Sequence, residues 1–131
     1  MIFLDTSGVI ALADNTDDFH DRAVQMFESA QKSGEDIVLH NYIVVESAAL
    51  LQRKLGSDSS IRFLKEASQF NIHWVDSRLH AQAVTYIDQN RTSKLSFVDV
   101  MSFLVMRSNK ITNFIGFDKH FTDAGFIQYG S

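Results

Sequence analysis

Short apolar runs alternating with longer helical stretches constrain the fold more than any other feature of this sequence. The first run, 2–4, is short and β-prone, as expected of a strand buried on both faces. Similar runs cover 37–39, 72–75 and 112–116, and 126–129 has the pattern of an edge strand. Helical spacing of apolar residues covers 8–13, 19–32, 42–55, 61–70, 77–90 and 97–107. Strands that alternate with helices indicate an α/β fold with a parallel sheet.

The composition is that of one soluble globular domain. The 131 residues suit a single domain, 1–131, and 45% apolar and 21% charged residues are ordinary values. The chain has no cysteine, which excludes disulfides and thiolate metal sites. No apolar run approaches the ~20 residues of a membrane span, and no signal-like segment precedes the first run, so we expect a cytoplasmic protein. A net charge of -4 argues against tight non-specific nucleic-acid binding, but a local basic surface is compatible with a nucleic-acid substrate.

Polar residues predict where several of the helices begin. Thr6 or Ser7 is the expected N-cap of the helix at 8–13, and Asn41 is the expected N-cap of the helix at 42–55. Residues 57–60 offer caps for the helix at 61–70.

Four acids stand apart from the other carboxylates, most of which lie on polar helix faces or in turns. Asp5 and Asp118 each follow a predicted strand. In open α/β sheets, the ligand crevice forms outside the carboxyl ends of the strands. Glu46 and Asp99 lie in predicted helices among large apolar neighbours, where a carboxylate loses hydration unless a cation or hydrogen bonds compensate.

Each acid taken alone has a simpler structural interpretation. Asp5 would serve as an N-cap, and Glu46 would lie on a solvent-facing stripe of its helix. Asp99 would close a capping box that begins at Ser96, and Asp118 would be a turn residue. Taken together, two acids at strand ends and two on apolar helices indicate a pocket that holds a cation.

The chemistry of such a pocket follows from its charge. Two unit charges ~5 Å apart repel by ~3 kcal/mol at an effective dielectric near 20. Four carboxylates therefore need raised pKa values or a cation among them. Oxygen ligands suit Mg²⁺ or Mn²⁺, and these ions commonly serve phosphodiester hydrolysis by activating a water and stabilising the leaving oxygen.

Four segments, in order along the chain, resemble the motifs of the PIN-domain family, and most closely its VapC-type toxin ribonucleases. Residues 2–7, IFLDTS, resemble the strand followed by D-T-S or D-T-N. Residues 41–46, NYIVVE, resemble the second acidic motif, 95–99, LSFVD, the third, and 116–126 the closing segment. The resemblance implies one PIN-like domain over 1–131, a three-layer α/β/α sandwich around a central, mainly parallel sheet of four to five strands.

The resemblance also implies an activity. It is that of a Mg²⁺- or Mn²⁺-dependent endoribonuclease that cleaves structured cellular RNA of the tRNA or rRNA class, as the toxin of a toxin–antitoxin pair. Thr6 or Ser7 would orient the metal, its water or the phosphate. The implied partners are the RNA, a cognate antitoxin that covers the active site with its C-terminal segment, and a second copy in a homodimer. The residues implied to be both metal ligands and catalytic groups, one of them the general base, are Asp5, Glu46, Asp99 and Asp118.

Further polar and aromatic residues are candidates for substrate contacts or for the core. Arg91 and Lys94 flank the loop before Asp99 and are the best candidates for phosphate contacts. His120, close to Asp118, is either near the pocket or a surface or packing residue, and we favour the second interpretation; Trp74 is interpreted as a core strand residue.

Two alternative functions compete with the nuclease. A non-catalytic PIN-like module would bind RNA or protein without turnover, and acids at all four positions argue against it. A receiver-like phosphoacceptor domain needs an acceptor aspartate after a central strand and a lysine after a late one. The predicted order of strands and helices, which places Glu46 and Asp99 on helices, supplies neither that aspartate nor that lysine.

Overall fold

The computed structural model describes residues 1–130, which contain five strands and seven helices. The strands are β1 (Ile2–Leu4), β2 (Ile37–His40), β3 (Asn71–His73), β4 (Asn113–Ile115) and β5 (Ile127–Gln128). The helices are α1 (Thr6–Ala13), α2 (His20–Lys32), α3 (Asn41–Leu55), α4 (Ser57–Ala67), α5 (Ser77–Gln89), α6 (Phe97–Ser108) and α7 (Lys119–Asp123). The predicted α/β class is confirmed. The helix α7 was not predicted, because five residues are too few to show a helical period.

The strands form one parallel sheet in the order β3-β2-β1-β4-β5. The chain moves outward from β1 through β2 to β3, then returns to the other side of β1 for β4 and β5. Phe3 of β1 pairs with Phe114 of β4 at this reversal. In open α/β sheets a ligand crevice forms outside the carboxyl ends of the strands at such a switch point.

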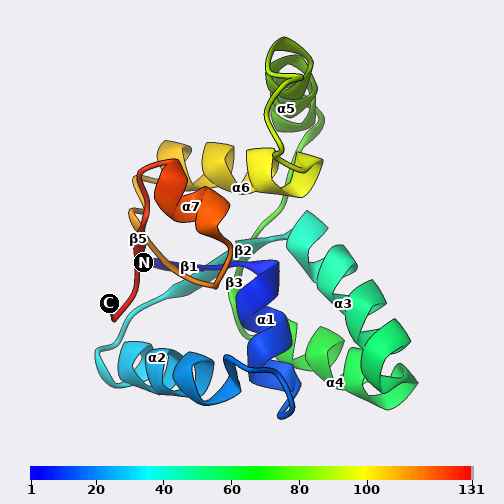
Figure 1. The fold of residues 1–131 in the computed structure, drawn as a ribbon, viewed down its shortest axis with the longest axis vertical. Coiled ribbons are helices and arrows are strands. Elements are labelled where there is room, and N and C mark those ends of the chain that lie inside the picture. The colour runs from blue at the N-terminus through cyan, green and yellow to red at the C-terminus, as the bar shows by residue number, and fades with distance from the viewer. Residues whose placement is uncertain (131) are drawn as a thin grey trace.

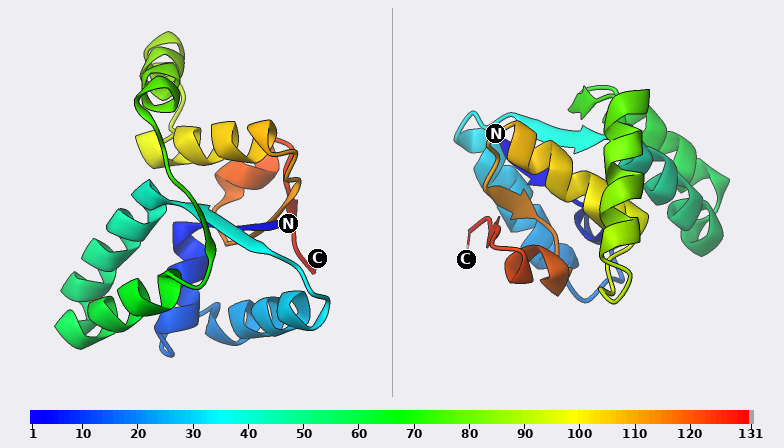
Figure 2. Two further views of the ribbon diagram at one scale, coloured as in Figure 1. Left: turned by 180° about the vertical axis from the view of Figure 1, so that it is seen from behind. Right: turned by 90° about the horizontal axis from the view of Figure 1, so that it is seen from above.

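Helices cover both faces of the sheet and give the predicted three layers (Figures 1 and 2). The helices α1, α2 and α4 lie on one side, and α6 and α7 lie on the other. The helix α3 leaves the carboxyl end of β2, and α5 projects beyond α6. Among the helices of residues 1–130, none combines the length and apolar character that crossing a membrane requires.

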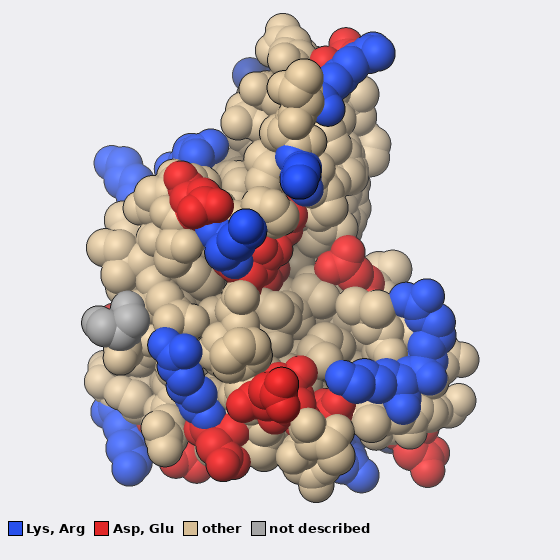
Figure 3. Space-filling model, in the orientation of Figure 1, with Lys and Arg blue, Asp and Glu red and all other residues tan. Residues whose placement is uncertain are grey.

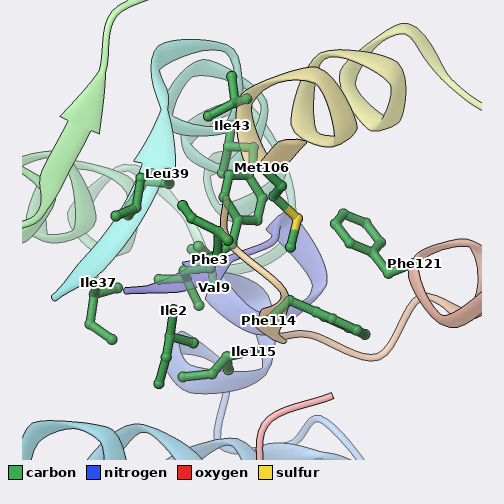
Figure 4. Close-up of a cluster of buried hydrophobic side chains, with 14 of the residues drawn as sticks. Ile2, Phe3, Val9, Ile37, Leu39, Ile43, Met106, Phe114, Ile115 and Phe121 are labelled. Carbon is green, nitrogen blue, oxygen red and sulfur yellow. The ribbon is translucent and has the colours of Figure 1, made fainter. Parts of the chain in front are cut away.

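The core is built around β1, whose three residues are all buried, as the prediction of a strand covered on both faces requires. The ring of Phe3 lies 6.3 Å from that of Phe121 of α7 and 5.9 Å from that of His40, measured between centroids. Figure 4 shows Met106 and Phe121 reaching the sheet from α6 and α7, and Val9 reaching it from α1.

Two predicted helix caps are wrong by one or two residues. Asp5, not Thr6 or Ser7, caps α1, because its carboxylate accepts the backbone N–H of Ser7. His40, not Asn41, caps α3: its Nδ1 accepts the backbone N–H of Ile43 at 3.3 Å. Asn41 instead accepts the backbone N–H of Val75 at 2.7 Å and ties the start of α3 to the chain after β3.

The segments at 57–60 and 72–75 also differ from the prediction. Residues 57–60 lie inside α4, because Gly56 adopts φ 98° and lets α4 follow α3 after a single residue. The third strand ends at His73, so the interpretation of Trp74 as a core residue is wrong. Its side chain is 71% exposed beyond the edge strand β3.

Candidate active site

Asp5 leaves the end of β1 at the switch point of the sheet. Its backbone N–H donates to the carbonyl of Ile115 at the end of β4, at 3.0 Å. Its carboxylate accepts the Ser7 hydroxyl at 2.9 Å and the Ser7 backbone N–H at 3.4 Å. The residue is 4% exposed, so these bonds replace most of its hydration.

Ser7 ties this strand end to the segment that carries Asp118. While its hydroxyl donates to Asp5, its oxygen accepts the backbone N–H of Phe117 at 2.8 Å. The two segments approach closely at Gly116, where an added Cβ would lie 3.0 Å from the Asp5 Cβ and 3.1 Å from the Ser7 Oγ. A side chain at this position would therefore push the two acids apart.

Asp99 comes from the first turn of α6 and is 9% exposed. The capping box is present: the Ser96 hydroxyl oxygen accepts the Asp99 N–H at 3.1 Å, and the Asp99 Oδ2 accepts the Ser96 N–H at 3.2 Å. The structural interpretation of Asp99 is therefore correct, and its carboxylate also lies in the site.

His120 lies in the site, contrary to the favoured interpretation as a surface or packing residue. Its Nδ1 lies 2.9 Å from the Asp118 Oδ1 and 3.7 Å from the Asp99 Oδ2, so it lies among the acids rather than in a separate surface or packing position. One ligand atom from each of Asp99, Asp118 and His120 lies within 4.8 Å of the others. The D-x-H spacing directly after a strand was the available signal.

These groups line one cleft of ≈ 610 Å³. Figure 3 shows acidic side chains gathered in a hollow at the centre of this face, with lysines and arginines on its margins. Glu46 reaches the cleft from α3 and Lys94 from the loop before α6. The complete lining is Asp5, Thr6, Ser7, Ile10, Asp17, Phe19, Glu46, Leu50, Lys94, Ser96, Asp99, Phe117, Asp118 and His120.

The structure thus brings together all four predicted acids with Thr6, Ser7 and Lys94. Arg91 is not among the residues that line the cleft. Its guanidinium donates to the Asp88 carboxylate at 2.9 Å, one helical turn earlier.

Burial and mutual repulsion raise the pKa of two of the acids. The pKa of Asp5 is raised to about 7, chiefly by loss of hydration, with the Ser7 hydroxyl and the Thr6 N–H opposing the shift and the charges of Asp99 and Asp118 adding to it. Burial likewise raises the pKa of Asp99, with the Asp118 charge adding to the shift. The pocket therefore resists carrying its full negative charge without a cation.

The donor set fits a hard divalent cation. Carboxylate and hydroxyl oxygens are the ligands that Mg²⁺ and Mn²⁺ prefer, and one imidazole is compatible with Mn²⁺. One buried polar atom of the cleft, the Thr6 Oγ1, makes no hydrogen bond to any described residue. Such atoms are uncommon, and its place beside the acids is consistent with a bound ion and its waters.

Comparisons with known proteins match nearly the whole chain. A family model described as PIN domain matches residues 2–127. The 23S rRNA-specific endonuclease VapC20 of Mycobacterium tuberculosis, from strains CDC 1551 / Oshkosh and ATCC 25618 / H37Rv, is 30% identical over 130 residues, which are 98% of this chain and 97% of VapC20. The crystal structure of VapC20, described as a sarcin-ricin loop cleaving toxin, superposes with a TM-score of 0.86 at 28% identity and covers 98% of both chains.

Proposed function

This chain belongs to the PIN domain family, and on that basis we propose that it is a metal-dependent endoribonuclease acting as the toxin of a toxin–antitoxin pair. The proposed substrate is structured ribosomal RNA, since VapC20 is a 23S rRNA-specific endonuclease and matches nearly the full length of this chain. The observation that carries the proposal is the convergence of Asp5, Glu46, Asp99 and Asp118 on one cleft at the switch point of the sheet.

We assign the four acids to the proposed metal site, with Mg²⁺ or Mn²⁺ as the ion. When bound there, the ion supplies charge to polarise the phosphate, lower the pKa of a water and stabilise the leaving oxygen. Ser7 fixes the Asp5 carboxylate, and the capping box fixes that of Asp99. One of the carboxylates takes the proton of the attacking water. Lys94, at the margin of the cleft, offsets the charge of the incoming phosphate.

The test is cleavage of ribosomal RNA by the wild type and by Asp5→Asn, with Mg²⁺, Mn²⁺ and EDTA side by side. Asn caps a helix as well as Asp does, so the variant removes the charge and keeps the start of α1. We expect discrete cuts with either ion, no cuts in EDTA, and a loss of at least a hundredfold in rate for Asp5→Asn, on the order of removing one electrostatic contact to the transition state. RNA that is bound but intact under every condition would instead establish the non-catalytic module.

The remaining partners belong to the same proposal. We propose a cognate antitoxin that covers the cleft, supported by the description of VapC20 as a toxin. Its test is whether the product of a neighbouring small reading frame co-purifies and suppresses cleavage. We also propose a cytoplasmic location, where ribosomal RNA is present.

A homodimer is proposed from the surface of α5. This helix projects from the body of the molecule, and Ala83 is its one buried residue. Trp74 and Val84 are large apolar side chains left 71% and 47% exposed near and on this helix. Light scattering during gel filtration measures the mass directly, and Val84→Glu is expected to convert a dimer to a monomer.

A further inference from the structure

Two phenylalanines from distant parts of the chain stack at the edge of the cleft. Phe19 precedes α2, and Phe117 directly precedes Asp118. Their ring centroids lie 4.4 Å apart, and the ring planes differ by 5°. Both rings line the cleft that holds the acids, and Phe19 is 44% exposed. A large flat apolar surface therefore lies open to solvent beside the proposed catalytic centre.

A second hollow lies on the other side of this pair. It measures ≈ 220 Å³ and shares Phe19, Phe117 and Asp118 with the cleft, so the stacked rings form a ridge between the two. The cations of this hollow are Arg22 and Lys119. The cleft thus carries most of the carboxylates, and the second hollow carries two cations beside Asp118.

Arg22 is held in place rather than free in solvent. Its guanidinium donates to the Gln128 Oε1 at 2.7 Å, and the Gln128 Nε2 donates to the Gly116 carbonyl at 2.7 Å. Its Cζ lies 5.8 Å from the centre of the Phe117 ring, within the range of a cation–π contact. The positive charge of Arg22 is therefore fixed beside Phe117, and Gln128 links it to the segment that carries Asp118.

The alternation of carboxylate pocket, aromatic ridge and basic hollow matches the parts of a nucleotide chain. Single-stranded RNA is held mainly by stacking of unpaired bases on aromatic rings and by cations along its phosphates. A ridge that only packed two loops together would have no need of an exposed ring face or of cations behind it.

We propose that the Phe19–Phe117 pair is the stacking platform for an unpaired base of the RNA substrate next to the scissile phosphate, and that Arg22 and Lys119 bind the next phosphate along the strand. The proposal rests on the proposed nuclease function and identifies how the same site selects single-stranded RNA. A base that adds to the open face of Phe19 extends a stack that the protein has already formed, so little ordering is needed on binding.

The test uses a fluorescent hairpin RNA that carries the sarcin–ricin loop, and the same hairpin with one abasic nucleotide moved through the loop. Binding is measured by anisotropy with Ca²⁺ in place of Mg²⁺, and a gel confirms that the RNA stays intact. The variants are Phe19→Leu, which is apolar but not aromatic, and Phe19→Trp, which keeps a stacking face. Ile61→Ala is the control, because Ile61 is a large apolar side chain, 50% exposed on α4, that lines neither hollow and lies outside the proposed dimer surface.

We expect Phe19→Leu to weaken binding roughly 5- to 100-fold, the usual effect of losing one base–aromatic stack, while Phe19→Trp and Ile61→Ala bind as the wild type does. One of the abasic hairpins should bind the wild type more weakly than the intact hairpin does. The same abasic hairpin should bind Phe19→Leu as tightly as the intact hairpin binds that variant. Equal affinities for all proteins, or an abasic profile that Phe19→Leu leaves unchanged, would overturn the platform. Circular dichroism of each variant shows that the fold is intact.

The cations give an independent readout. Arg22→Gln and Lys119→Gln should each lower the slope of log affinity against log salt by about 0.7, the value for one phosphate of a single strand, whereas Phe19→Leu leaves the slope unchanged. Unchanged slopes for both cation variants overturn the assignment of the basic hollow. Cleavage by the wild type distinguishes the nuclease proposal from the platform proposal. If the wild type does not cleave the RNA, both proposals fail. If it cleaves but the abasic effect does not depend on Phe19, only the platform proposal fails.

Discussion

Asp5 accepts hydrogen bonds at the start of α1 and lines the cleft with the same carboxylate. Asp118 does the same at α7, and Asp99 does so within the capping box of α6. At the residue scale the cap and the functional acid are therefore one group, not alternatives. Because the N-terminus of a helix carries partial positive charge, this placement eases the repulsion among the acids.

Replacing Asp5 with Asn is expected to stabilise the protein in EDTA at pH 8. The pKa of Asp5 is about 7 in the folded chain, against 3.8 ordinarily. Between these values the folded state holds a proton that the unfolded chain has lost, so the free energy of unfolding falls as the pH rises from about 4 to 7. Asn cannot ionise, and the variant should gain on the order of 2–4 kcal/mol at pH 8, at about 1.4 kcal/mol per pKa unit.

Urea denaturation across this pH range measures the effect. Asp14→Asn is the matched control of opposite sign, because the hydrogen bond from Lys54 lowers the pKa of Asp14 to about 2. A less stable Asp5→Asn at pH 8 would show that the Asp5 charge is not costly in the folded protein.

His40 supplies a second pH dependence, at a buried network that joins α3 to α6. Its Nε2 lies 2.9 Å from the Ser102 hydroxyl, which donates to the Val98 carbonyl. Burial, with a smaller effect of His73, lowers the pKa of His40 from 6.5 to about 3. Between these values the unfolded chain binds a proton that the folded state excludes, so stability should be lost as the pH falls from about 6.5 to 3.

The slope of the free energy of unfolding against pH should approach 1.4 kcal/mol per unit from this group. His40→Gln should lower stability at pH 7.5 and flatten that slope. Identical slopes for wild type and His40→Gln would contradict the neutral, buried state of His40.

The acids could be predicted from sequence because their positions relative to the strands and apolar neighbours are local features. The place of His120 beside Asp118 is a local feature too, but its approach to Asp99 within 3.7 Å depends on how α6 packs. Arg91 was expected to face the substrate, but Asp88, near the end of α5, offers it a closer partner. The roles of the site residues stay predictions until the variants are measured.

At the scale of elements, the approach of α1 to β4 decides how closely the acids gather. Gly8 makes this approach possible: an added Cβ would lie 2.5 Å from the Ile115 carbonyl oxygen. The existence and order of the strands and of six helices within residues 1–130 followed from periodicity. The caps were harder to predict, because Asp5, Thr6 and Ser7 are all good caps, and tertiary contacts choose between them.

Gly8→Ala is expected to destabilise the protein by about 1–3 kcal/mol, the usual cost of overpacking, and to reduce cleavage further by shifting α1 and Asp5. Denaturation and the RNA cleavage rate measure the two effects. Gln31→Ala, on the exposed surface of α2, is the control and should change neither. A Gly8→Ala protein of unchanged stability would mean that α1 moves away from β4 at little cost.

At the scale of the molecule, the strand order brings the two ends of the chain together. Phe3 and Leu4 pair with Phe114 and Ile115, and β4 in turn pairs with β5. A sheet and core shared in this way support the proposal that 1–131 is one domain. We expect a single unfolding transition that coincides in far-UV circular dichroism and tyrosine fluorescence. Two separated transitions would contradict that proposal.

The pairing of β1 with β4 also has a consequence for synthesis. Asp5 is made long before the strand that fixes it and the loop that carries Asp118. Parallel pairing across such a separation is slow to form, because the long intervening loop must close first. A nascent chain therefore holds no assembled cleft until β4 and Asp118 have left the ribosome. For a protein whose proposed substrate is ribosomal RNA, the order of the strands keeps the acids apart for most of the synthesis of this domain.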